Sequence, residues 1–209
     1  MAVAIVACAV SCKKDKTEID DESVMASIAE QFVNNTVAPT YTNLATYSEQ
    51  LASQIETLKS NPTQANLDQV CETFKTARLW WEKSEAFLFG AASDYGIDPH
   101  IDSWPLDEDA FNIMMTNEAQ IAAMDADNGD EYAGEVLGKA LLGFHGIEYI
   151  IFENGAAKQV GNITDKELIY AAAVAGDLRN CCYQLEVAWV GEDKAPKSHV
   201  EKLDDLELA

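Results

Sequence analysis

Apolar residues recur at intervals of three and four along most of this 209-residue chain, and this spacing constrains its fold more than any other feature. Between residues 22 and 61 the positions that follow it are Val24, Ile28, Phe32, Leu44, Tyr47, Leu51, Ile55 and Leu58. On an α-helix such spacing places the apolar side chains on one face. No segment alternates convincingly between apolar and polar residues as a half-buried strand would. The sequence therefore predicts an all-α protein, built as an up-and-down helical bundle.

Turn-forming residues divide the chain into helices with short connections. Pro39 should kink or interrupt the first helix, because proline cannot donate a backbone hydrogen bond. Residues 91–107 should form a loop that packs against the bundle, since it carries several large apolar side chains. Thr164 and Glu167 have the spacing of a capping box at the start of a helix. The four long helices are expected over residues 22–61, 61–90, 131–152 and 164–190, with a shorter helical stretch over 107–125.

The chain is strongly acidic. It holds 36 Asp and Glu residues against 14 Lys and Arg residues, for a formal net charge of -22. Binding to nucleic acid depends on clustered Lys and Arg side chains that neutralise phosphates, so no nucleic acid is expected as a partner. Cations and basic partners would be attracted instead.

The first twelve residues resemble an export signal. Residues 2–10 are apolar but too few to span a bilayer, which takes about 20 apolar residues. We expect residues 1–12 to be a lipoprotein signal remnant, with Cys12 carrying the lipid and Cys8 as the alternative. The charged residues 13–22 would form a flexible tether. This predicts a cell-envelope protein, an outer-membrane lipoprotein facing the periplasm or the cell surface, held on the membrane by its lipid anchor.

Two ionisable residues interrupt an otherwise apolar stretch over residues 141–152. These residues are His145 and Glu148, three apart on one face of the expected helix. A buried charge without a partner would cost several kcal/mol, so both side chains need partners. Gly143 and Gly146 each cost a helix about 1 kcal/mol relative to alanine. We expect that cost to be offset by close approach of a neighbouring helix or a ligand.

Glu82 and Glu85 form a second pair of ionisable residues three apart, on the helix predicted over residues 61–90. If this helix faces the one that carries His145 and Glu148, one imidazole nitrogen and several carboxylate oxygens can meet. That donor set suits iron, zinc or manganese. The alternative is a helical scaffold in which the same side chains form only a buried polar network.

Three motifs, in this order along the chain, resemble those of the imelysin family. They are Trp81 to Gly90, Ile101 to Asp107, and Gly143-Phe144-His145-Gly146-Ile147-Glu148, which matches the GxHxxE motif. The resemblance implies an all-helical fold of two bundle-like halves with a site between them, an exported or lipid-anchored protein, and a link to bacterial iron uptake. By the same resemblance the candidate metal-site residues are His145, Glu148, Glu82, Glu85 and Asp102.

Members of this family are considerably longer than the present chain. We therefore expect residues 23–190 to form the amino-terminal bundle of the two-bundle fold. Residues 191–209 would be a charged tail at which the second half is truncated.

The resulting hypothesis is an exported lipoprotein that binds a divalent or trivalent metal ion, iron or zinc, or an iron-bearing ligand, with envelope iron-transport components as further partners. The runner-up is a metal-dependent peptidase of the imelysin type. The zinc-peptidase motif H-E-x-x-H is not met, because Gly146 follows His145 and Tyr149 stands where the second histidine would be. Geometrically, we expect Glu82 and Glu85 to face His145 and Glu148 across a helix contact, with Asp102 approaching from the loop.

Overall fold

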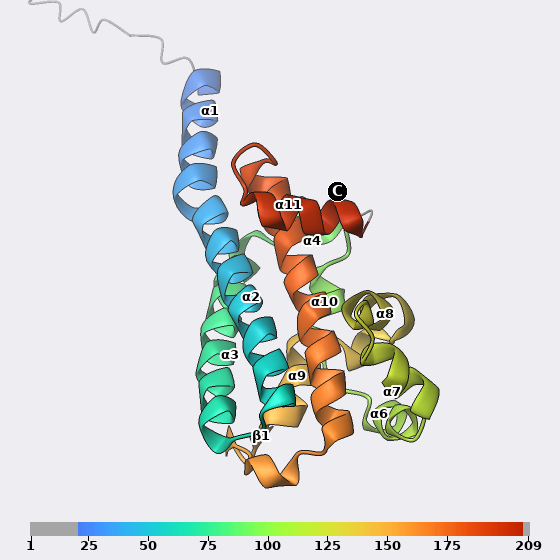
Figure 1. The fold of residues 1–209 in the computed structure, drawn as a ribbon. Helices are drawn as coiled ribbons and strands as arrows, with labels where there is room; N and C mark the ends of the chain where they lie inside the picture. The colour runs from blue at the N-terminus through green and yellow to red at the C-terminus, as the bar shows by residue number, and fades with distance from the viewer. Residues whose placement is uncertain (1–20, 207–209) are drawn as a thin grey trace, which may run out of the picture.

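Three long helices form the centre of the molecule in the computed structural model, which describes residues 21–206. They are α2 (Ala38–Ser60), α3 (Gln64–Ser84) and α10 (Asp165–Val190). Helix α2 lies between α3 and α10 and runs antiparallel to both (Figure 1). The apolar face predicted for α2 is buried, with no exposed surface at Leu44, Leu51, Ile55 and Leu58. The prediction of an all-α bundle is confirmed.

The first predicted helix is interrupted as expected, but by a π-helical turn. Helix α1 (Asp21–Phe32) passes into this turn, η1 (Val33–Val37), and then into α2. The N–H of Ala38 bonds to the carbonyl of Val33, five residues back. Pro39 follows at the start of α2, where its missing N–H is tolerated. Helix α1 therefore continues the line of α2 and projects beyond the bundle (Figure 1).

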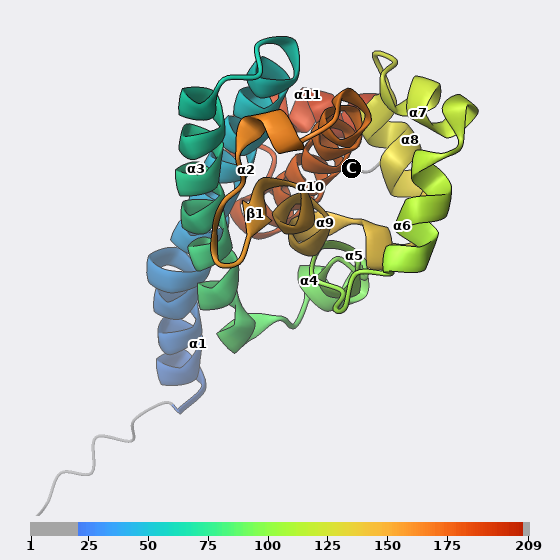
Figure 2. The same cartoon turned by 90° about the horizontal axis from the view of Figure 1, so that it is seen from below.

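Shorter helices lie on the side of α10 away from α2. Their order along the chain is α4 (Ala91–Asp94), α5 (Asp98–Ile101), α6 (Glu108–Met115), α7 (Glu118–Met124) and α8 (Gly129–Val136). Helices α7 and α8 contact α10, and α6 packs against α7 on the outer side (Figure 2). The segment predicted as a packed loop contains α4 and α5, and its Ile97 and Ile101 are buried. Trp104 in the same segment is 74% exposed.

The prediction of a single helix over residues 131–152 is wrong. The chain forms α8, the 3-10 turn η3 (Lys139–Leu141) and then α9 (Gly143–Ile151), followed by a two-residue hairpin. Its strands β1 (Phe152–Glu153) and β2 (Ala156–Ala157) pair antiparallel. Gly143 has a φ of +68°, which a continuous α-helix does not allow. The apolar spacing could not show this change of backbone direction.

Helix α10 begins with the predicted capping box, in which the Thr164 and Glu167 side chains each bond to the backbone N–H of the other residue. It is buried on most sides and contacts α2, α8, α9 and α11. Residues 191–209 were predicted to be a charged tail, but they include α11 (Lys197–Asp205), whose His199 and Leu203 are buried against α10. Within residues 21–206, no helix combines the length and the apolar character needed to cross a bilayer.

Candidate functional site

The two motif glycines position α9. A Cβ atom on Gly143 would lie 2.0 Å from the carbonyl oxygen of Ile101, at the end of α5. A Cβ atom on Gly146 would lie 2.5 Å from the hydroxyl of Tyr170 on α10, which donates a 2.6 Å hydrogen bond to the Leu141 carbonyl. Both glycines therefore allow close approach of a neighbouring element. This was expected, because each glycine destabilises a helix relative to alanine. The approach at Gly143 brings α5 directly against the start of α9.

Asp102, just after α5, is the largely buried centre of the site. Its Oδ2 accepts a 2.7 Å hydrogen bond from Trp81 Nε1, and its Oδ1 forms an ion pair with Arg78 Nη1. The same Oδ1 lies 3.1 Å from His145 Nε2. Only 12% of the Asp102 side chain is exposed. Three donors from α3 and α9 thus surround one carboxylate.

The Arg78 guanidinium links this carboxylate to a second one. Burial alone would lower the pKa of Arg78, but hydrogen bonds and charge from Asp102 and Glu82 raise it above its usual value. Its Nε lies 2.7 Å from Glu82 Oε1, and its guanidinium lies 5.3 Å from the centre of the Phe144 ring. Arg78 remains positively charged and compensates the buried negative charge of Asp102.

The other edge of the His145 ring faces Glu148. Glu148 Oε2 lies 3.1 Å from His145 Nδ1, and 49% of the Glu148 side chain is exposed. Carboxylate oxygens only accept hydrogen bonds, whereas a neutral imidazole has a single N–H. A neutral imidazole can therefore donate to only one of the two carboxylates, and the nitrogen that faces the other carboxylate has a lone pair that can bind a cation. The exposed Nδ1 edge is the one that a cation can reach.

The structure separates the predicted site residues into two groups. His145, Asp102 and Glu148 are in contact, whereas Glu82 reaches only Arg78. Helix α3 ends at Ser84, and Glu85 starts the 3-10 turn η2 (Glu85–Phe87) as an exposed residue. Within residues 21–206 the Glu85 backbone N–H bonds to the Glu82 carbonyl, but its side chain has no hydrogen bond or ion pair. The expected convergence of all five side chains on one buried point is therefore wrong.

Three neighbours of His145 had not been assigned a role from the sequence. Arg78 and Trp81 bind Asp102, and the Trp104 ring lies 4.8 Å from the His145 ring between centroids. Arg78 could have been recognised, because it is a charged residue within the apolar stripe that runs from Phe74 to Trp81 on α3.

A groove of about 530 Å³ opens beside His145 and Glu148. Aromatic side chains form much of its wall: Phe74, Trp104, Tyr149 and Phe152. Its charged lining residues include Lys75, Glu108 and Glu153. An apolar wall with a few polar groups is the usual character of a small-molecule site.

The donors present fit a metal only in part. A metal-binding histidine commonly gives its other ring N–H to a carboxylate, which fixes the ring orientation. Asp102 occupies that position on the Nε2 edge, which leaves His145 Nδ1 and Glu148 as ligands on the groove side. Asp102 itself is already bound by Arg78 and Trp81, so a cation there would meet a guanidinium. This chain thus offers two protein ligands at the groove and the residues that orient them.

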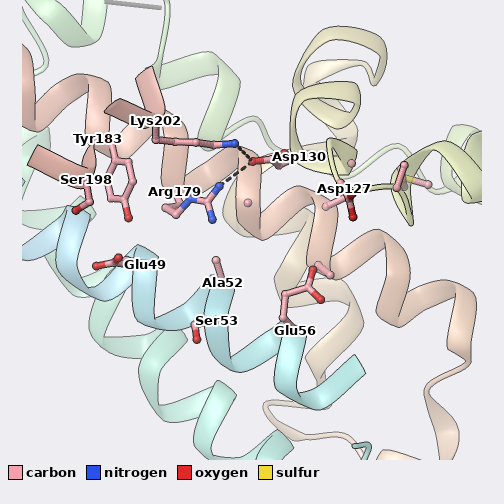
Figure 3. Close-up of a pocket in the computed structure, with 16 residues that line it drawn as sticks. Glu49, Ala52, Ser53, Glu56, Asp127, Asp130, Arg179, Tyr183, Ser198 and Lys202 are labelled. Atoms are coloured by element: carbon pink, nitrogen blue, oxygen red, sulfur yellow. Dashed lines mark hydrogen bonds and ion pairs between the residues drawn. The ribbon is translucent and has the colours of Figure 1, made fainter. Parts of the chain in front are cut away.

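A second groove, of about 470 Å³, lies between α2, α8 and α10 (Figure 3). None of the predicted site residues lines it. Its Arg179 and Lys202 side chains point at Asp130 and form ion pairs with it. Asp130 thus already has two cationic partners, so we do not place the site there.

Comparisons with known proteins agree with the fold. The family described as Imelysin matches residues 37–207. Iron-regulated protein A of Synechococcus elongatus is 29% identical over 158 residues, which are 76% of this chain and 38% of that protein.

Two crystal structures also resemble the chain. A protein of Parabacteroides distasonis, provisionally described as an iron-regulated protein A precursor, superposes with a TM-score of 0.70 at 25% identity, over 79% of this chain and 45% of that one. An imelysin-like protein of Psychrobacter arcticum superposes with a TM-score of 0.64 at 16% identity, over 88% of this chain and 54% of that one. The chain spans less than half of the curated relative and about half of each crystallised chain.

Proposed function

This chain belongs to the imelysin family, and we propose that it binds iron, as the ion or as an iron-bearing small molecule, in the groove beside His145. The name of its relative, iron-regulated protein A, supports an iron-related role. The observation that carries the proposal is the placement of His145 between two carboxylates, one buried and one exposed at the groove.

Each residue has a distinct part in this proposal. Asp102 accepts the Nε2–H of His145 and fixes the ring, while Arg78 and Trp81 hold Asp102. The lone pair of His145 Nδ1 then points toward the groove, where iron replaces the proton shared with Glu148. A nitrogen and a carboxylate oxygen are a donor set that iron accepts, with its remaining positions open to water or to the ligand that carries it. The aromatic wall of the groove provides contact area for an organic carrier.

Two alternatives make different predictions. A peptidase needs further ligands and a general base, and His145 and Glu148 alone do not supply the H-E-x-x-H set. We expect no metal-dependent hydrolysis of unfolded protein substrates. A purely structural polar network would account for Asp102, Arg78 and Trp81, and it predicts that neither iron nor an iron complex raises the Tm.

The test is thermal unfolding of the protein with Fe²⁺ under anaerobic conditions, with Zn²⁺, and with ferric citrate as an iron-bearing small molecule. A ligand that binds only the folded state at 100 times its Kd stabilises by about 2.7 kcal/mol, which raises the Tm of a protein of this size by roughly 5–10 °C. A response to Fe²⁺ supports binding of the ion, and a response to ferric citrate alone supports binding of a complex.

The matched variants are His145→Ala and Glu148→Gln, with Glu85→Gln as the control because Glu85 is exposed. We expect the first two to abolish the rise in Tm caused by ferric citrate and to reduce the rise caused by Fe²⁺, and the control to retain both. Unchanged binding in both site variants, or no response to any of the three probes, would overturn the proposal.

We further propose a cell-envelope location with lipid attachment at Cys12. Cys8 and Cys12 lie outside the described residues, so this rests on the sequence pattern of residues 1–22. Binding to envelope iron-transport components is the corresponding proposal for partners.

A further inference from the structure

A second group of metal-ligating side chains lies away from the groove beside His145. His100 comes from α5, and Asp177 and Cys181 lie one turn apart on α10. One ligand atom from each residue can be chosen so that all three atoms lie within 4.8 Å of one another. Within residues 21–206 no other three His, Cys, Asp or Glu side chains meet this distance.

The geometry at His100 and Asp177 is close to that of two metal ligands. His100 Nε2 lies 2.9 Å from one carboxylate oxygen of Asp177 and 3.2 Å from the other. In a tetrahedral zinc site, a nitrogen and an oxygen each about 2.1 Å from the metal are about 3.4 Å apart. An ion could enter between them with a shift of a few tenths of an ångström, provided that the Cys181 thiol turns toward it.

The environment of these side chains favours a bound cation. Asp177 and Cys181 are buried. Helix α8 closes over the carboxylate, since a Cβ atom on Gly134 would lie 2.3 Å from Asp177 Oδ1. A buried carboxylate whose ion-pair partner is a single histidine carries a desolvation cost that a divalent cation would offset.

The three side chains also line a cavity of about 210 Å³, which gives an ion access and a fourth donor. Glu131 and Glu135 of α8 line the same cavity and are both solvent-accessible. A carboxylate from one of them, or a water molecule, can complete four-coordination.

We propose that His100, Asp177 and Cys181 form a binding site for a borderline divalent transition metal such as Zn²⁺. A mixed set of imidazole, carboxylate and thiolate ligands is typical of such ions rather than of Mg²⁺ or Ca²⁺. On binding, the S–H bond of Cys181 breaks, a sulfur–metal bond forms, and the proton passes to solvent. The site is independent of the iron proposal, because it shares no ligand with His145 and Glu148.

The site would also bear on the position of Asp102. His100 and Asp102 are two residues apart, at the end of α5. A metal that ties His100 to α10 would therefore restrain the same short helix that places Asp102 against His145. A metal bound at His100 would therefore stabilise the groove beside His145 without entering it.

Co²⁺ titration of the Cys8→Ser/Cys12→Ser protein tests the proposal, because a thiolate ligand gives Co²⁺ a sulfur-to-metal charge-transfer band that imidazole and carboxylate ligands do not. The two amino-terminal cysteines are replaced so that they cannot contribute. We expect one equivalent of Co²⁺ to produce the band and Zn²⁺ to displace it.

Further variants assign the band to its ligands. Adding Cys181→Ser should remove it, and His100→Gln should weaken binding at least 100-fold, whereas Cys71→Ser, Cys182→Ser and His145→Ala should leave it intact. Circular dichroism shows whether Cys181→Ser folds. If it does not, His100→Gln tests the site instead, because His100 is partly exposed and its replacement should leave the fold intact. No charge-transfer band, or a band that persists in Cys181→Ser or is unchanged in His100→Gln, would overturn the site. Loss of the iron response in His145→Ala with an intact Co²⁺ band would separate the two proposals.

Discussion

Asp102 Oδ1 lies 3.1 Å from His145 Nε2 and so joins two motifs that are 43 residues apart in the chain. The contact exists because Gly143 lets α9 begin directly against the carbonyl of Ile101. Asp102 is also bound by Arg78 and Trp81 of α3. One buried carboxylate therefore fixes the relative positions of α3, α5 and α9 and the orientation of the histidine.

Asp102→Asn should destabilise the protein and weaken metal binding. An asparagine at this position keeps the shape but removes the charge that compensates Arg78, and it turns an N–H donor toward another donor. Arg78 keeps Glu82 as an ion-pair partner and 23% of its side chain is exposed, so we expect a loss of about 2–3 kcal/mol, which reflects the lost charge-assisted hydrogen bonds of Asp102. Loss of a carboxylate that orients a metal-binding histidine costs about 10- to 100-fold in affinity. Urea unfolding and Fe²⁺ titration measure the two effects.

Glu82→Gln is the control for this variant, because it also removes a carboxylate that pairs with Arg78. Glu82 is 45% exposed, so we expect a loss of less than about 1 kcal/mol. Equal losses in the two variants would mean that Asp102 is not the buried centre of the site.

Gly143→Ala should destabilise the protein far more than Gly155→Ala. Both glycines have positive φ, +68° and +78°, so each alanine bears a left-handed backbone cost of about 1–2 kcal/mol. Only at Gly143 would the new Cβ atom collide with a backbone carbonyl; nothing lies within 4 Å of the corresponding atom on Gly155. We expect a total of about 3–5 kcal/mol at Gly143 and about 1–2 kcal/mol at Gly155. Similar melting temperatures for the two variants would contradict the close approach of α5 and α9.

Labelled palmitate should be incorporated into the protein when it is expressed in a bacterial host with its amino terminus intact. Residues 2–10 supply the apolar segment, and Cys12 directly precedes the charged stretch. Cys12→Ala should abolish incorporation, while Cys8→Ala tests the alternative site. Label that remains in the double variant Cys8→Ala/Cys12→Ala would rule out both cysteines.

The long helices could be predicted from the sequence because the signals that specify them lie within each helix. The spacing of apolar residues identifies α2 and α10, and the Thr164 capping box fixes the start of α10. The break before α9 could not be predicted in this way. The cost of Gly143 to a helix was visible, but whether a neighbouring element offsets that cost or the helix ends there depends on where α5 lies.

The contacts of the candidate site also differ in whether local sequence could predict them. His145 and Glu148 are three residues apart on one helix, so their contact follows from helix geometry alone. Glu82 and Glu85 have the same spacing, but α3 ends at Ser84 and Arg78 takes Glu82 as a partner. The meeting of His100 with Cys181 depends on how α5 lies against α10, which no local pattern in the sequence indicates.

The ion pairs of Asp130 in the second groove should make stability depend on pH (Figure 3). Burial alone would raise the pKa of Asp130, but hydrogen bonds from Lys202 and Asn180 and the charges of Lys202 and Arg179 lower it below its ordinary value of 3.8. A carboxyl with a lower pKa in the folded state binds fewer protons there than in the unfolded state. Its contribution is therefore complete above pH 3.8 and is lost as the pH falls through the lower folded value.

Asp130→Asn should accordingly cost about 2–3 kcal/mol near neutral pH, and the difference from the unaltered protein should shrink as the pH falls below 3.8. Asp177 also faces Asp130, and burial raises its pKa, but Asp177 is present in both proteins and its effect largely cancels in the comparison. Asp127→Asn is the control, since Asp127 lines the same groove but is exposed. Urea unfolding from pH 7 down to pH 3 measures the difference. A gap between Asp130→Asn and the unaltered protein that stays constant over this range would mean that neutral hydrogen bonding, and not the charge of Asp130, holds α8 and α11 against α10.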